Sequence, residues 1–167
     1  MCWAEFAAAA PEIAAHVREQ FEQLRVALIA TIRSDGSPRI SGAEPVMFYG
    51  DLYLGMMWRS RKAIDLQRDP RVVIHNPICS NAGDELEFSL NGLAIEVHDA
   101  KLRRRFMAAV AETTTWKEPH FHLFAIDIKS AALVKYEQGR TVGEGVAGWH
   151  RVEAAVLLTG KRRPHPS

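Results

Sequence analysis

The sequence predicts a mainly β domain, a closed antiparallel barrel with a few flanking helices, and two observations lead to this class. Six or seven apolar, strand-like segments are separated by short turns rich in Gly, Pro, Asp and Asn, whereas few segments show helical periodicity. The 167 residues, 47% of them hydrophobic and 25% charged, suffice for one core but are few for two. We therefore expect a single domain over residues 1–160 and a disordered tail over residues 161–167.

The order of the expected elements follows from periodicity and turn residues. Pro11 can begin a helix, and apolar residues recur at helical spacing from there to Leu24. Turn residues between apolar runs delimit the strands, and Pro70 ends a short amphipathic helix. The expected strands cover residues 25–33, 39–48, 52–57, 71–75, 86–98, 120–129 and 131–136, and the later helices cover residues 61–68 and about 100–110.

Composition argues against several classes of protein. The formal net charge of +1 is unlike the strongly basic balance of most nucleic-acid-binding proteins. The two cysteines offer neither a disulfide framework nor paired zinc-ligand spacing. The first residues lack the basic region of a secretory signal, and no apolar run approaches membrane-spanning length. We expect a cytoplasmic protein with no membrane or nucleic-acid partner.

A cationic cluster lies between an apolar strand and the helix expected at residues 61–68. It consists of Ser60, Arg61 and Lys62, preceded by Arg59. Hydroxyl, guanidinium, ammonium and free helix N–H groups can converge there on one anion. Three cationic side chains in four positions repel one another unless an anion or carboxylates lie among them. The cluster therefore indicates a phosphate site, and the alternative is a solvated basic turn.

Three small residues, Ser41, Gly42 and Ala43, form a second candidate feature. Pro45 cannot donate to a sheet ladder, so this segment is expected at an edge or bulge. Small side chains let a planar ligand lie against the backbone, although a barrel corner would also use glycine. Together with the cationic cluster after the next strand, they favour a planar group over residues 41–43 and a phosphate at residues 60–62.

No Ser/His/Asp, Cys/His or paired-carboxylate arrangement stands out, so we assign no catalytic residue. His120 and His122 provide two metal ligands at best, and we expect no metal site.

The motifs and their spacing resemble those of a known family. The resemblance extends roughly from Arg25 to Val97 and is carried by Leu28-Ile29-Ala30-Thr31-Ile32, Asp35-Gly36-Ser37-Pro38, Ser60-Arg61-Lys62 and Asp69-Pro70-Arg71-Val72. Together these resemble the FMN-binding split barrel of pyridoxamine 5'-phosphate oxidase and its relatives. The resemblance implies a six- or seven-stranded antiparallel split β-barrel and a homodimer with FMN at the subunit interface.

The resemblance also implies which residues bind the cofactor. Arg61 and Lys62 would hold the flavin phosphate with Ser60, and the two preceding strands would contact the ribityl chain and ring. The full set is Ser41, Gly42, Ala43, Met56, Met57, Ser60, Arg61 and Lys62. The partner subunit would complete the wall through Trp149, Arg151 or the loop near Asn76 and Cys79.

The implied function is an FMN-dependent oxidoreductase that passes electrons between a reduced nicotinamide or other donor and a small-molecule acceptor. Ser41 and Glu87 stand where vitamin B6 oxidases have a basic residue and an amide, which argues against vitamin B6 oxidation. One alternative is a reductase using the deazaflavin coenzyme F420, with Arg59, Arg68 and Arg71 serving its acidic tail. Another is a non-catalytic flavin- or haem-binding protein.

Overall fold

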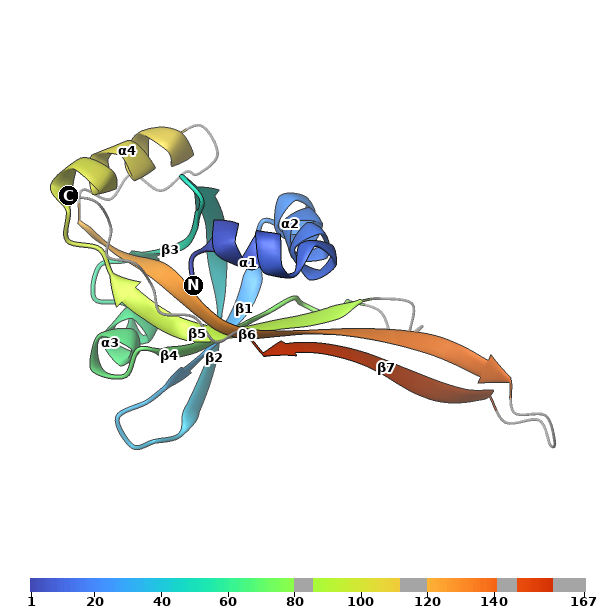
Figure 1. Cartoon of the computed structure of the whole chain (residues 1–167). Helices are drawn as coiled ribbons and strands as arrows, with labels where there is room; N and C mark the ends of the chain where they lie inside the picture. The colour runs from blue at the N-terminus through green and yellow to red at the C-terminus, as the bar shows by residue number, and fades with distance from the viewer. Residues whose placement is uncertain (80–85, 112–119, 141–146, 158–167) are drawn as a thin grey trace.

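The computed structural model describes residues 1–79, 86–111, 120–140 and 147–157, and from residue 135 onward it describes the backbone alone. Its described strands form one antiparallel sheet in the order β3-β2-β1-β4-β5-β6-β7, and an additional pairing between β3 and β6 closes six of them into a barrel (Figure 1). The predicted fold class is therefore confirmed. The strands are β1 (Ala27–Ile32), β2 (Pro38–Phe48), β3 (Asp51–Met57), β4 (Arg71–His75), β5 (Glu87–Glu96), β6 (Phe121–Arg140) and β7 (Ala147–Leu157).

Two helices close the barrel interior and a third lies outside it. Side chains of α1 (Trp3–Ala9) and α2 (Pro11–Leu24) belong to the same apolar cluster as the inward-facing residues of the barrel. α4 (Ala100–Val110) instead buries Phe106 against Tyr53 and its neighbours on the outer face of β3 and β6. Helix α3 (Arg61–Arg68) follows β3 and packs against β1, where it buries Ala63 and Leu66.

The strand predicted at residues 120–129 and the one predicted at residues 131–136 are wrong as separate elements. They form a single strand, β6, which continues through Ser130. A register shift at Asn91 and Gly92 of β5 allows this, because the extra residue lets the paired strands bend without ending. A Cβ at Gly92 would lie 2.6 Å from the carbonyl oxygen of Asp127, so glycine is required at this close approach.

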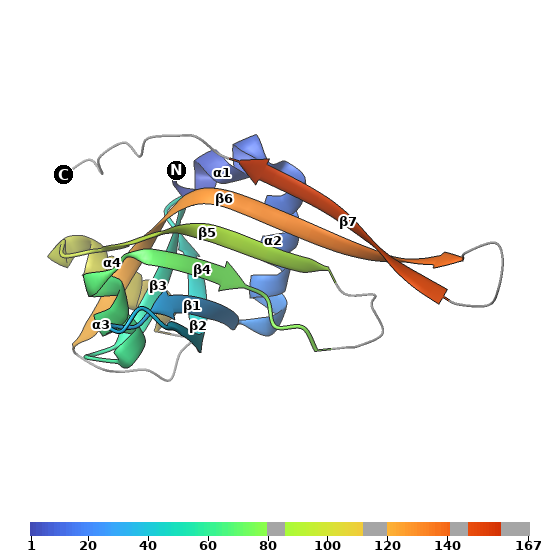
Figure 2. The same ribbon diagram turned by 90° about the horizontal axis from the view of Figure 1, so that it is seen from below.

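Beyond the barrel, β6 and β7 continue together as a two-stranded ribbon. The two strands pair from Ser130 with Leu157 to Arg140 with Ala147, and because β5 also pairs with β6 as far as Val134, the two-stranded part comprises residues 135–140 and 147–152. Both views show the ribbon extending away from the other strands (Figures 1 and 2). Strand β7 and helix α1 were not predicted from the sequence. Among the described residues, no helix is both long enough and apolar enough to span a membrane.

Candidate functional site

Helix α3 begins beside β2 with polar groups at its first turn. Ser60 is the residue before the helix, and its hydroxyl makes no capping bond. The hydroxyl oxygen is buried and has no hydrogen-bond partner in the described part of the chain. The first turn also contains no acidic residue that would occupy its free N–H groups. An anion placed here would meet a hydroxyl and free backbone donors.

Lys62 adds a cationic group to the same first turn of α3. Its side chain is partly buried, and the ammonium donates a hydrogen bond to the carbonyl oxygen of Gly42. Burial lowers the pKa of Lys62, and the nearby carboxylate of Glu44 only partly opposes this effect. The ammonium is thus poorly solvated, which an additional anion would relieve. Arg59 and Arg61 are exposed beside it.

The middle of α3 is fixed by a buried carboxylate, Asp65. Its oxygens accept hydrogen bonds from Thr31 at 3.0 Å and from Arg39 at 2.6 Å. Burial raises the pKa of Asp65, but these bonds and the positive charges outweigh burial and leave the pKa below its ordinary value. Since Thr31 and Arg39 lie on β1 and β2, Asp65 holds the helix against both strands.

The predicted residues of β2 and β3 divide between the two sides of the barrel wall. Ser41 pairs with Ile29 and Ala43 with Ala27, both fully buried partners, so these two residues face inward. Gly42 lies between them on the opposite face, and its carbonyl oxygen accepts the hydrogen bond from Lys62. The side chain of Met56 lies in the barrel core, whereas Met57 is 63% exposed. The hydrogen bond from Lys62 thus brings Gly42 to the start of α3, where Ser60 and Arg61 also lie.

A pocket of about 680 Å³ adjoins this cationic surface. Two lining residues, Val26 and Glu44, connect the pocket to the cationic cluster. Val26 supplies the nearest atom to a Cβ placed at Gly42, and the carboxylate of Glu44 interacts electrostatically with Lys62. Six of the ten residues that line the pocket are apolar, and the other four carry charges of both signs. The lining residues are Arg18, Phe21, Glu22, Leu24, Arg25, Val26, Glu44, Pro45, Val46 and Met47.

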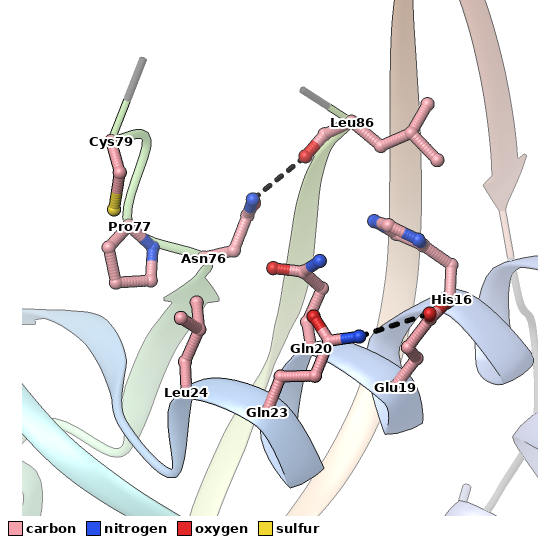
Figure 3. Close-up of a pocket in the computed structure, with 9 residues that line it drawn as sticks. All are labelled: His16, Glu19, Gln20, Gln23, Leu24, Asn76, Pro77, Cys79 and Leu86. Carbon is pink, nitrogen blue, oxygen red and sulfur yellow. Dashed lines mark hydrogen bonds between the residues drawn. The ribbon is translucent and has the colours of Figure 1, made fainter. Parts of the chain in front are cut away.

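A second pocket, of about 410 Å³, lies on the other side of α2 and is more polar. Figure 3 shows His16, Gln20 and Gln23 of α2 facing Asn76 and Leu86 across it. Nε2 of His16 is buried without a hydrogen-bond partner among the described residues. Burial lowers the pKa of His16, although Glu19 partly opposes this.

The arginines considered for an acidic tail are largely paired within the chain. Arg71 binds Asp69 at 2.6 Å, and the hydrogen bonds from Arg71 lower the pKa of Asp69 to about 2. Arg68 donates to the carbonyl of Ile32. Glu87 stands where vitamin B6 oxidases have an amide, and its Oε1 lies 3.2 Å from Nε2 of His75. The side chains of Trp149 and Arg151 lie outside the described residues.

Three residues near the cationic cluster were not assigned to the site from the sequence, where His122 was considered only as a metal ligand. His122 is buried beneath the turn that precedes Ser60, and Glu96 and Gln67 lie against it. No local signal separates His122 from an ordinary strand residue. Within the described ranges, no group of three or more His, Cys, Asp or Glu side chains is arranged to hold a metal.

A six-stranded antiparallel barrel closed by β3 and β6, with a cationic helix start on its outer surface, defines the chain as a split-barrel protein. The chain belongs to the pyridoxamine 5'-phosphate oxidase family, whose sequence model matches residues 13–135. No curated protein matches the sequence.

Several solved structures share the fold. A putative pyridoxamine 5'-phosphate oxidase from Listeria innocua is 17% identical with a TM-score of 0.57, over 71% of this chain and 95% of that one. The haem storage protein HutZ from Vibrio cholerae is 18% identical with a TM-score of 0.57, over 68% and 88%. General stress protein 26 from Bacillus anthracis is 20% identical with a TM-score of 0.51, over 71% and 93%.

Proposed function

We propose that this protein binds FMN, with the flavin phosphate at the start of α3, and acts as an oxidoreductase on a small molecule. The observation that carries the proposal is the buried hydroxyl of Ser60, which has no hydrogen-bond partner among the described residues and lies at the start of the helix turn that contains the partly buried Lys62. A phosphate would accept hydrogen bonds from both groups and from free N–H groups of the helix. When bound, FMN would supply the electron-transfer chemistry.

The surroundings of the cationic cluster fit the rest of the cofactor. Gly42 exposes bare backbone next to Lys62, and a Cβ there would have Val26 as its nearest neighbour, at 3.7 Å. A ribityl chain would therefore meet no side chain at this position. The adjoining pocket between α2 and β2 offers apolar side chains for a planar ring.

We also propose that the protein works as a homodimer. Ile40 is 71% exposed and Leu28 is 37% exposed on the outer face of β1 and β2, close to Gly42. From residue 135 onward, β6 pairs with β7 alone among the described strands, and an isolated two-stranded ribbon is marginally stable in water. A second copy that covers these surfaces would enclose the flavin ring, which a single chain would leave exposed on one side.

A haem-binding protein is the competing function, because one of the similar structures is described as a haem storage protein. The two functions predict different spectra. Purified protein incubated with equal FMN and haemin and then desalted should retain flavin absorbance at about one FMN per chain. Retention of haem with loss of flavin would contradict the proposal.

A further inference from the structure

His122 has a hydrogen-bond partner at each ring nitrogen although its side chain is almost fully buried. The backbone N–H of Arg59 donates to Nε2 at 3.2 Å, and Nδ1 lies 2.7 Å from Oε1 of Glu96. Because an N–H group can only donate, Nε2 carries no proton. The proton therefore lies on Nδ1 and is donated to Glu96, which makes the imidazole neutral with one defined tautomer.

Glu96 is itself held in place. The amide of Gln67 on α3 donates to its second oxygen at 2.9 Å. Burial raises the pKa of Glu96, but the hydrogen bonds from His122 and Gln67 outweigh burial and keep the pKa below its usual value. An ionised carboxylate can only accept, so it requires the proton of His122 to remain on Nδ1.

The turn above the imidazole has an uncommon backbone conformation. Arg59 has a φ of 55°, in the left-handed region that non-glycine residues seldom occupy. The ring of Trp58 lies parallel to that of His122, with centroids 4.6 Å apart and planes 7° apart. The imidazole thus contacts both residues that precede Ser60, and Ser60 closes the turn by donating to the carbonyl of Met57 at 3.1 Å.

We propose that His122 is a positioning residue: Nε2, oriented by Glu96, holds the left-handed turn at Arg59 and so fixes the start of α3 where an anion binds. His122 itself touches no ligand in this account. The effect of His122 on ligand binding rests on the proposed FMN function, whereas its effect on the turn at Arg59 does not.

Two substitutions at residue 122 distinguish the role of the hydrogen-bond acceptor from that of the aromatic ring. His122→Phe keeps a ring for Trp58 and removes Nε2, whereas His122→Gln supplies an amide oxygen that accepts at every pH. We expect His122→Phe to speed hydrogen exchange of the Arg59 amide about tenfold, because that amide loses its acceptor. FMN binding should weaken about tenfold, because the turn before Ser60 is no longer held. His122→Gln should restore both, and riboflavin binding should not change. His120→Phe, an exposed histidine beside the same tryptophan, is the matched control.

Exchange at Arg59 is read by NMR and does not depend on any ligand. Unchanged exchange in folded His122→Phe overturns the proposal whatever happens to FMN. If the unmodified protein does not prefer FMN to riboflavin, the FMN function fails, and Arg59 exchange still decides the positioning role. If His122→Phe does not fold, Glu96→Leu gives the same decision, because leucine offers Nδ1 no acceptor and leaves the amide of Gln67, 3.5 Å away, as its polar neighbour. The imidazole ¹⁵N shifts should then show the proton moving to Nε2, and Arg59 exchange should rise. Unmoved shifts and exchange overturn the proposal.

Discussion

The ammonium of Lys62 donates a hydrogen bond to the carbonyl oxygen of Gly42, so the first turn of α3 is tied to the outer surface of β2. This contact joins the two features that stood out in the sequence, the cationic cluster and the run of small residues. A cation at a helix start and bare backbone beside it are what a phosphate followed by an extended chain would need.

Removing the cations should weaken FMN binding through its phosphate alone. A charge-assisted hydrogen bond contributes about 1.5–3 kcal/mol, so Lys62→Ala or Arg61→Ala should raise the FMN dissociation constant about 10- to 100-fold. Riboflavin, which has no phosphate, should bind unchanged. Fluorescence titrations of both flavins measure this, with the exposed lysine of α4 replaced in Lys101→Ala as the control. Unchanged FMN affinity in both variants would remove the site from these residues.

Two glycines should respond in opposite ways to added side chains. At Gly42 the nearest atom to a Cβ is 3.7 Å away, an ordinary contact, so Gly42→Leu should fold normally while blocking the cofactor. At Gly92 a Cβ would lie 2.6 Å from backbone, so Gly92→Ala should lower the melting temperature by several degrees. Melting curves and bound-flavin content distinguish the two. A strong loss of stability in Gly42→Leu would mean that this glycine is a structural corner.

Asp65 should make stability depend on pH in the acidic range. The pKa of Asp65 is lowered in the folded state, despite burial, by Arg39 and Thr31. Its contribution is therefore present above the unfolded pKa of about 4 and is lost as the pH falls through the folded value. Asp65→Asn should destabilise the protein by about 2–4 kcal/mol at pH 7 and flatten this acid dependence. Urea unfolding at pH 7 and pH 3 tests it, and an Asp65→Asn variant as acid-sensitive as the parent would contradict it.

Much of the fold follows from local chemistry, and the predicted bounds of α2, α3 and β4 agree with the structure. Pro11 begins α2, and Pro70 prevents α3 from continuing into β4. The two halves of β6 were predicted as separate strands, and only the pairing of Ser130 with both β5 and β7 shows that the strand continues past the irregularity at Lys129. The continuity of β6 is therefore determined by contacts with its neighbouring strands and not by its local sequence.

The face of each site residue was harder to predict than its strand. Strand β3 is buried on both sides, by the core and by α4, so its sequence does not alternate between apolar and polar residues. The opposite exposures of Met56 and Met57 therefore gave no sequence signal. His122 and Glu96 meet across paired strands 26 residues apart, a contact that local periodicity does not encode.

Dimerisation should depend on the outer face of β1 and β2. Ile40→Asp places a charge on a residue that is 71% exposed in the single chain, and we expect it to convert a dimer to monomers and to weaken FMN binding. Tyr49→Asn, at a 73% exposed residue at the far end of β2, should remain dimeric. Light scattering at low micromolar protein measures the mass. A monomeric parent protein that binds FMN at full strength would contradict the interface site.

The most direct test of the central claim is the ratio of the dissociation constants of riboflavin and FMN in the unmodified protein, with and without inorganic phosphate. If the phosphate group is bound by Ser60, Arg61 and Lys62, FMN should bind at least tenfold more tightly, and added phosphate should weaken FMN binding while sparing riboflavin. Equal affinities, unaffected by phosphate, would show that the cationic start of α3 does not bind the cofactor.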